Sequence, residues 1–458
     1  MRFSLKGALK TTSAISIATI ISFTTVAGAQ AQTQASQAEQ VAAETEAAIK
    51  DYMPELNDAD INELSDWYGQ LDEQPTMPED FYAVPTELPS ANGQIIKSID
   101  LNPNYGFTLA VPQPVATAQK IMYKSTDYKG QPVAITGTLF EPQAAWKGKG
   151  ERPVIAFAPG TQGLGDPCAP SQQIEAGTEY EATALISLLN SGYTVVMTDY
   201  LGSGTEGTHS YLNRVDQANA VLDSARAVTD AGLSSSSAPV GIWGYSQGGG
   251  AAAAAAELQT SYAPELKVKG VMAGAVPADL GAVMNKIDGT TYNGFMLMGL
   301  AGLGDSYGVD YSQYLNKKGI EAAERIREIC TGDALKEFGS IRNTGMYTLS
   351  GQKMSQVMKN SPELQHILDE NALGQEGRHP SAPTLIVSSV ADDVIPHKSN
   401  RKLANSYCQA GTRVSFYAPL TLIHAVGGIA AIPRGLIFMD RQFKGLPNSN
   451  ECWVVQGG

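Results

Sequence analysis

The chain has 458 residues, of which 43% are hydrophobic and 17% charged, and its formal net charge is −14. This length accommodates one large α/β domain or two average ones, and the apolar content supports a sizeable core, which excludes wholesale disorder. The acidic balance argues against a nucleic-acid-binding protein and against docking on anionic lipid through a basic patch.

Residues 1–29 have the pattern of an export signal. Arg2, Lys6 and Lys10 form a positive start, residues 14–26 are mainly apolar, and the Ala-Gly-Ala sequence at 27–29 is a small-residue cleavage site. We therefore predict a secreted or cell-envelope protein. No other stretch of the sequence is long and apolar enough to span a bilayer.

The four cysteines are expected to form disulfides, because an exported chain matures in an oxidising compartment. The sequence alone allows three pairings of Cys168, Cys330, Cys408 and Cys452. The spacing of these cysteines and of the five histidines does not resemble a metal clip, so we predict no metal site.

The chain after the export signal divides into an acidic leader and a folded domain. Residues 30–78 are polar, rich in carboxylates and interrupted by prolines, which predicts a surface-hugging or partly flexible leader, with a partner-binding arm as the alternative. The domain is expected over residues 79–458. Near its start, Gln119–Thr126 and Pro132–Phe140 flank a turn at 127–130 and predict a β-hairpin.

Short apolar runs then alternate with helical patterns. The expected strands are Pro153–Ala158, Tyr193–Asp199, the run from Val240 toward Ser246, Val268–Ala275, Pro383–Val390 and Arg413–Tyr417. Thr178 with Glu181 fits a capping box for a helix that ends near Asn190. Pro433–Phe443 fits a closing helix with its proline in the first turn. The alternation predicts an α/β fold with a mostly parallel sheet covered by helices on both faces.

The alternation breaks at about residues 277–378. Glycine, methionine, tyrosine and helical patterns mix there without a clear strand, and a bare loop of this length is unlike a compact domain. We predict a helical cap above the Ser246 end of the sheet. Most of its methionine and phenylalanine side chains are expected in the cap core, and a few are expected to face substrate.

The stretch from Val240 to Gly250 is the strongest chemical signal. An apolar run leads into Gly-Tyr-Ser-Gln-Gly, and an alanine-rich segment follows at once, which predicts strand, sharp turn and helix with Ser246 at the apex. A serine on such a strained turn needs neighbours without a Cβ two residues before and two after it. The turn exposes the hydroxyl and aims the unpaired N–H groups of the new helix at it.

A serine nucleophile needs a base, and the base needs an acid that fixes its tautomer. On a strand-turn-helix scaffold the chain order is serine, acid, histidine. Of the histidines after Ser246, His366 lies in the expected cap, His379 in a polar linker, and His397 too close behind the candidate acids. His424, in a loop after the last strand, is therefore the predicted base.

Two neighbouring aspartates follow the strand before that loop. Asp392 is the predicted acid and Asp393 is the alternative, since one of the pair must point away, where a loop hydrogen bond or a helix cap would hold it. Acyl transfer through a serine forms an oxyanion, which needs preorganised hydrogen-bond donors. The expected donors are the backbone N–H of Gln247 and that of Thr161 or Gln162, in the loop after the Pro153–Ala158 strand.

These residues resemble the secretory lipase family of α/β-hydrolases, which includes the lipase A type of yeast. The resemblance runs from Asp80 to Cys452 on Asp80-Phe81-Tyr82, Gly160-Thr161-Gln162-Gly163, Cys168-Ala169-Pro170-Ser171, Gly244-Tyr245-Ser246-Gln247-Gly248-Gly249, Ser261-Tyr262-Ala263-Pro264-Glu265-Leu266, Ala391-Asp392-Asp393-Val394-Ile395-Pro396 and His424. It implies a helical cap, esterase or lipase activity, no cofactor, and pairing of Cys168 with Cys330 and of Cys408 with Cys452. The chain departs from the family in the loop Pro-Gly-Thr-Gln-Gly, near which relatives place an acidic side chain.

The resulting expectation is a secreted serine carboxylester hydrolase acting on acylglycerols or other acyl esters. Acyl transfer to an alcohol in the cell envelope, and a catalytically inactive binding protein of the same fold, are the alternatives. We expect a lipid or small acyl-ester substrate, transient contact with a lipid surface, no nucleic-acid partner and a monomer.

Overall fold

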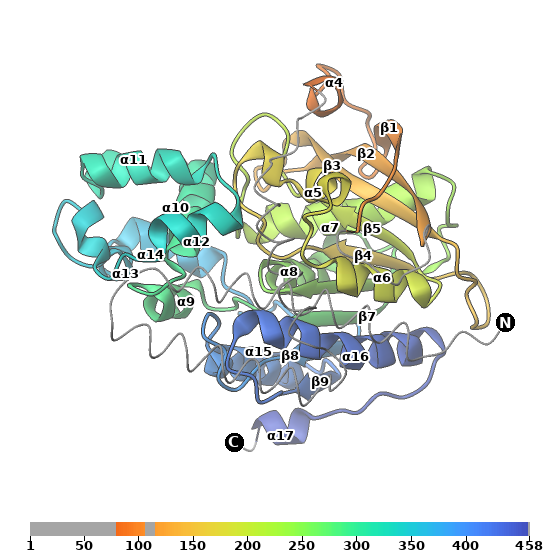
Figure 1. Cartoon of the computed structure of the whole chain (residues 1–458). Coiled ribbons are helices and arrows are strands. Elements are labelled where there is room, and N and C mark those ends of the chain that lie inside the picture. Colours follow the sequence, from red (N-terminus) through yellow and green to blue (C-terminus); the bar gives the residue numbers. More distant parts are fainter. Residues whose placement is uncertain (1–78, 106–114, 457–458) are drawn as a thin grey trace, which may run out of the picture.

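The computed structural model describes residues 79–105 and 115–456 (Figure 1). The predicted export signal and acidic leader lie outside these residues. Among the helices that are described, none combines the length and the apolar character that a membrane span requires.

A nine-stranded sheet with the order β1-β2-β3-β5-β4-β6-β7-β8-β9 forms the centre of the molecule. The strands are β1 Ile95–Leu101, β2 Ala116–Thr126, β3 Pro132–Pro142, β4 Val154–Ala158, β5 Thr194–Thr198, β6 Pro239–Tyr245, β7 Lys267–Gly274, β8 Thr384–Val387 and β9 Val414–Tyr417. Neighbouring strands from β1 through β2 and β3 to β5 run antiparallel. Neighbouring strands from β5 through β4, β6, β7 and β8 to β9 run parallel. The predicted hairpin is β2 and β3, whose turn is closed by backbone N–H groups of Lys129 and Gln131 donating to Asp127.

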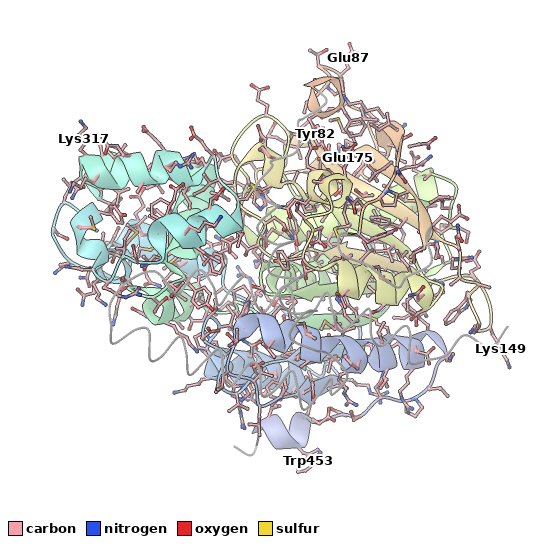
Figure 2. The ribbon with its side chains drawn as sticks, viewed as in Figure 1. Tyr82, Glu87, Lys149, Glu175, Lys317 and Trp453 are labelled. Atoms are coloured by element: carbon pink, nitrogen blue, oxygen red, sulfur yellow. A yellow bond between two sulfur atoms is a disulfide. The ribbon has the colours of Figure 1, made fainter. Side chains whose placement is uncertain are left out.

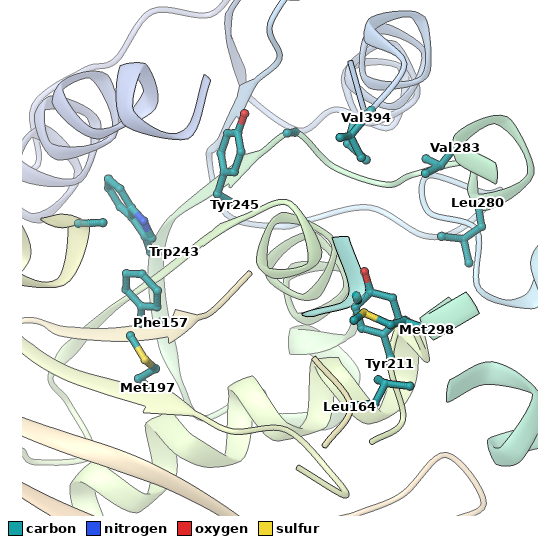
Figure 3. Packing of buried hydrophobic residues seen from close by; sticks show 14 of the residues in the cluster. Phe157, Leu164, Met197, Tyr211, Trp243, Tyr245, Leu280, Val283, Met298 and Val394 are labelled. Atoms are coloured by element: carbon teal, nitrogen blue, oxygen red, sulfur yellow. The ribbon is translucent and has the colours of Figure 1, made fainter. Parts of the chain in front are cut away.

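The parallel strands bury both of their faces, as the near-continuous apolar runs predicted. Phe157, Met197, Trp243 and Tyr245 face one side of the sheet (Figure 3). On that side they pack against α6 Ala182–Asn190 and α16 His424–Phe443. The alternate residues face the other side and pack against α7 Arg214–Asp230, α8 Gln247–Tyr262 and α15 His397–Gln409. Two apolar layers therefore fix the strand ends that carry the candidate site.

A helical cap stands between β7 and β8 in the chain, beside the sheet, as predicted (Figure 1, green to blue). It comprises α9 Leu280–Ile287, α10 Asn293–Tyr307, η3 Tyr311–Gln313, α11 Lys317–Ile326, α12 Thr331–Phe338, η4 Thr344–Tyr347, α13 Met354–Asn360 and α14 Pro362–Glu370. Most apolar side chains of α10, including Met296, Leu297 and Met298, are buried in the cap core. Phe295, on the same helix, instead lines the cavity beside Ser246.

The start of the described chain is anchored on the sheet by the Asp-Phe-Tyr segment of α4 Glu79–Tyr82. The hydroxyl of Tyr82 hydrogen-bonds to Ser171 Oγ at 2.8 Å, in α5 Pro170–Ala176, which follows η2 Asp166–Cys168. The fully buried ammonium group of Lys120 lies 5.1 Å from the centre of the Tyr82 ring and 2.8 Å from a carboxylate oxygen of Glu175. Tyr82 and Glu175 accordingly lie on the same side of the molecule (Figure 2).

Both disulfides have the pairing that the family resemblance implied. Cys168–Cys330 joins the segment after β4 to the cap, and Cys408–Cys452 joins α15 to α17 Cys452–Gln456. The first of these joins cysteines 162 residues apart in the chain. It therefore ties the cap to the segment that follows β4.

Two sequence predictions about helix ends are wrong. α6 begins at Ala182 without a capping side chain, because the carboxyl group of Glu181 accepts the N–H of Gly160 instead. The closing helix begins at His424 rather than Pro433, which lies inside it. Pro433 is exposed on α16, and the packing of this helix against the sheet outweighs the loss of one backbone hydrogen bond, so the helix continues through it.

Candidate active site

Ser246 occupies the turn between β6 and α8 with φ 60° and ψ −122°, a strained conformation for a residue with a side chain. The flanking glycines make this turn possible. A Cβ added to Gly244 would lie 2.1 Å from the carbonyl oxygen of Gly248, and one added to Gly248 would lie 2.0 Å from that of Ala158. Backbone atoms cannot move aside as side chains do, so both positions require glycine.

His424 meets Ser246 as predicted, although it is the first residue of α16 and not a loop residue. Its Nε2 lies 2.8 Å from Ser246 Oγ. The hydroxyl of Tyr245, next to the serine, donates to the backbone carbonyl of His424 at 2.8 Å. The histidine is therefore held against the turn that carries the serine.

Asp392 completes the line of hydrogen bonds. Its Oδ2 lies 2.9 Å from His424 Nδ1, and its Oδ1 accepts the backbone N–H groups of Val394 and Ile395. Burial raises the pKa of Asp392, but the neighbouring imidazole and these donors outweigh burial and hold the pKa below its ordinary value. The carboxylate thus stays ionised and fixes the Nδ1–H tautomer of His424, leaving Nε2 free to accept a proton.

Asp393 turns away from the imidazole ring but stays in the site. Its Oδ1 accepts the backbone N–H of His424 at 2.7 Å, and its Oδ2 accepts the hydroxyl of Tyr292 at 2.6 Å. The first contact is the helix-capping role foreseen for the second aspartate, here at the start of α16. The second contact ties the cap to the loop that carries Asp392.

The pKa of His424 follows from two opposed effects. Burial of the ring, whose side chain is 12% exposed, lowers it, and the carboxylate of Asp392 raises it. The carboxylate prevails, so the pKa lies above the ordinary value of 6.5. A basic imidazole that can hold a proton during a reaction is what a general base requires.

The other candidate histidines lie elsewhere. His366 and His379 are exposed, and His397, at the start of α15, bonds to Ser388. Sequence reasoning missed His209, whose Nε2 lies 3.0 Å from the side-chain amide nitrogen of Gln247. Burial lowers the pKa of His209 to about 4, so it is neutral, with Nδ1–H donating to Leu201 and Nε2 accepting from Gln247. A histidine that precedes Ser246 does not fit the chain order of serine, acid and histidine, so the sequence pattern carries no signal for His209.

The two candidate oxyanion residues of the loop after β4 differ in position. Thr161 lines the cavity beside Ser246, and its hydroxyl hydrogen-bonds to that of Tyr211 at 2.8 Å. Gln162 directs its side chain to the carboxylate of Glu179, at 2.9 Å. Of the two residues, Thr161 lies in the wall of the cavity beside Ser246 and Gln162 does not. Gln247 begins α8, where the first N–H groups of the helix have no intrahelical partner.

The cap holds this loop in place. Thr331 donates its N–H to the carbonyl of Gln162 and its hydroxyl to the carbonyl of Thr161. The adjacent Cys330 forms the disulfide with Cys168. A backbone loop anchored on both sides in this way is preorganised, which is what stabilisation of a developing oxyanion requires.

An acidic side chain reaches the same loop from another segment. The carboxyl group of Glu181 lines the cavity and accepts the N–H of Gly160. Burial, together with the neighbouring carboxyl of Glu179, raises the pKa of Glu181 well above its ordinary value. Within residues 79–105 and 115–456, no group of three or more histidine, cysteine or acidic side chains could hold a metal ion.

Known proteins are similar to this chain in sequence. The secretory lipase family model matches residues 169–451. The chain is 29% identical over 392 residues to a Mycobacterium tuberculosis protein named probable inactive lipase, covering 82% of this chain and 84% of the relative. It is 28% identical to Lipase 2 of Candida albicans, covering 82% and 83%.

Solved structures agree on the fold. Candida antarctica lipase A in its closed state superposes with a TM-score of 0.71 at 21% identity, over 82% of this chain and 89% of that one. The rice cell wall degrading esterase LipA of Xanthomonas oryzae superposes with a TM-score of 0.61 at 20% identity, over 77% and 97%. The sheet order and flanking helices are those of an α/β-hydrolase. The chain belongs to the secretory lipase family, and its function falls within the lipase and esterase class.

Proposed function

We propose that this protein is an exported serine carboxylester hydrolase that cleaves acylglycerols or other acyl esters through an acyl-enzyme. The observation that carries the proposal is the unbroken line from Ser246 Oγ through the imidazole of His424 to Asp392, with contacts of 2.8 and 2.9 Å. In this line the acid fixes the tautomer, the base faces the hydroxyl, and the hydroxyl faces a cavity.

The chemistry follows from these positions. Ser246 Oγ attacks the ester carbonyl and gives its proton to His424 Nε2, while Asp392 stabilises the imidazolium that forms. The backbone N–H groups of Gln247 and of Thr161 or Gln162 receive the oxyanion. The tetrahedral intermediate collapses when the C–O bond to the alcohol breaks and His424 returns the proton to the departing oxygen. Water then attacks the acyl carbon while His424 Nε2 takes a proton from it. The bond between that carbon and Ser246 Oγ breaks, His424 returns the proton to Oγ, and the carboxylic acid leaves.

A second candidate function has one observation in its favour, because a relative at 29% identity is named a probable inactive lipase. An inactive binding protein would need no continuous line of hydrogen bonds behind its serine. In this chain Ser246, His424 and Asp392 are all present and in contact, which supports an active enzyme.

Ester turnover separates these functions. The purified protein is incubated with p-nitrophenyl butyrate, with and without ethanol, and both p-nitrophenol and the acyl product are measured. A hydrolase releases butyric acid in amounts equal to p-nitrophenol. No turnover at all would support the inactive binding protein, and ethyl butyrate as the main product would support acyl transfer.

The pH dependence of kcat/KM is expected to follow the neutral form of His424. Protonated His424 cannot accept the serine proton, so activity falls about tenfold per pH unit below its pKa. Because Asp392 raises that pKa, the midpoint of the fall is expected above pH 6.5. Asp392→Asn removes the carboxylate that raises the pKa of His424, so the midpoint should move to lower pH. Steady-state rates on a p-nitrophenyl ester from pH 4 to 9 test both, and an unchanged midpoint in the variant contradicts the assignment.

A further inference from the structure

Both backbone groups of His424 are held by other segments of the chain. Its N–H donates to Asp393 Oδ1 at 2.7 Å, and its carbonyl accepts the hydroxyl of Tyr245 at 2.8 Å. His424 is the first residue of α16, and Ile423 before it has no side-chain oxygen to accept the orphan N–H groups of the first turn. Asp393, from the loop after β8, takes that part. The placement of the imidazole therefore depends on a second carboxylate, which bonds to the backbone and not to the ring.

The cap holds the other oxygen of this carboxylate. The hydroxyl of Tyr292 donates to Asp393 Oδ2 at 2.6 Å. Tyr292 immediately precedes α10, and its ring stacks on that of Phe295 with the ring centres 5.6 Å apart. Both rings line the cavity that Ser246 and His424 also line. A side chain in the cavity wall is therefore connected through two hydrogen bonds to the backbone of the base.

The charges that act on His424 come from the loop after β8 and from the cap. Asp392 and Asp393 both raise the pKa of the imidazole, and the ammonium group of Lys286, in α9, lowers it. Lys286 donates to the backbone carbonyl of Asp392. Across the cavity, burial raises the pKa of Glu181 well above its ordinary value, so that carboxyl favours its neutral form. Asp393 thus acts on the base in two ways, through a hydrogen bond to its backbone and through its charge.

We propose that Asp393 is a positioning residue for the base His424 and that Tyr292 of the cap acts on catalysis through it. The two neighbouring aspartates then have separate roles. Asp392 sets the tautomer of the ring, and Asp393 fixes the first turn of α16, from which the ring projects. Helix ends fray, and a shift of about 1 Å in a catalytic group can cost about 100-fold in rate. This inference rests on the proposed hydrolase function and adds two residues to its mechanism.

Two replacements of Asp393 separate its hydrogen bond from its charge. Asp393→Ala removes both, and kcat on p-nitrophenyl butyrate is expected to fall by about 10- to 100-fold. KM should change little, because His424 serves both the formation and the hydrolysis of the acyl-enzyme, and slowing both steps alike leaves their ratio unchanged. Asp393→Asn keeps an acceptor for the N–H of His424, so kcat above the pH midpoint should stay near wild type. Loss of the charge should move the midpoint of the kcat/KM profile to lower pH.

A double-mutant cycle tests the link to the cap. Tyr292→Phe keeps the ring in the wall of the cavity and removes only the hydroxyl, and kcat is expected to fall by about threefold or more. In the Asp393→Ala background that hydroxyl has already lost its acceptor, so the same change should cause no further loss. Equal losses in the two backgrounds would show that Tyr292 does not act through Asp393.

Asp279→Ala is the matched control, because Asp279 caps α9 by accepting the N–H of Ala282 at 2.9 Å. It should leave kcat and the pH midpoint at their wild-type values. The inference is overturned if Asp393→Ala keeps the wild-type kcat, or if the control loses as much as Asp393→Ala does.

Circular dichroism shows whether each variant is folded. Should Asp393→Ala fail to fold, an unchanged midpoint in Asp393→Asn or an unchanged kcat in Tyr292→Phe overturns the inference. Each of these results leaves ester hydrolysis at Ser246 intact, whereas a wild-type protein that turns over no ester would overturn the proposed function itself.

Discussion

Replacing Ser246 with alanine is expected to lower kcat for a short acyl ester by about 10⁵-fold. The residual rate would come from the oxyanion donors and from substrate binding, which still act when the nucleophile is lost. The conformation of the turn should persist, because φ 60° is enforced by contacts of the backbone and not by the serine hydroxyl.

The measurement is kcat on p-nitrophenyl butyrate for Ser246→Ala beside Ser261→Ala. Ser261 lies exposed near the end of the same helix, α8, so its variant should match wild type. Asp392→Asn should lose about 10⁴-fold, because the tautomer of His424 is then wrong. If Ser246→Ala kept near-wild-type turnover, another group would have to be the nucleophile.

Gly248→Ala is expected to cost about 3 kcal/mol of unfolding free energy and most of the activity. The new Cβ would lie 2.0 Å from the carbonyl oxygen of Ala158 and 2.9 Å from that of Pro159, so β4 and α8 must separate. That movement displaces the loop carrying Thr161 from the start of α8. The two expected oxyanion donors would then no longer face the same point.

Gly281→Ala provides the control for the loss of a glycine. Gly281 lies in α9, where an added Cβ meets no atom closer than 3.6 Å. Alanine is the better helix former by about 1 kcal/mol, so this variant should be as stable as wild type or slightly more stable. Urea unfolding followed by circular dichroism measures both variants. Equal stability of Gly248→Ala and wild type would show that the turn between β6 and α8 tolerates a Cβ at residue 248.

The sheet and the hydrogen-bonded line of Ser246, His424 and Asp392 were predictable because they depend on local patterns. Parallel strands buried on both faces read as short apolar runs, and the residues that follow them gather at one edge of the sheet. Ser246, Asp392 and His424 each follow such a run, so chain order alone placed them together. The choice of Asp392 over Asp393 agrees with its position because only Asp392 contacts the imidazole.

The errors arose where a tertiary contact replaced a local one. Glu181 looked like part of a capping box, but its carboxyl bonds to Gly160 in a loop distant in sequence. Pro433 looked like a helix start, but packing of α16 on the sheet outweighs the loss of one hydrogen bond. His209 and the cavity beside Ser246 have no local pattern, since they depend on how separate segments pack.

The most direct test of the central claim is labelling by a fluorophosphonate, which reacts with an activated serine. The folded protein is treated with the probe, and the intact mass and the masses of its peptides are measured. We predict one adduct per chain, located on Ser246, with no adduct in Ser246→Ala. A folded wild-type protein that remains unlabelled, or that carries its adduct on another residue, would contradict the assignment of Ser246 as the nucleophile.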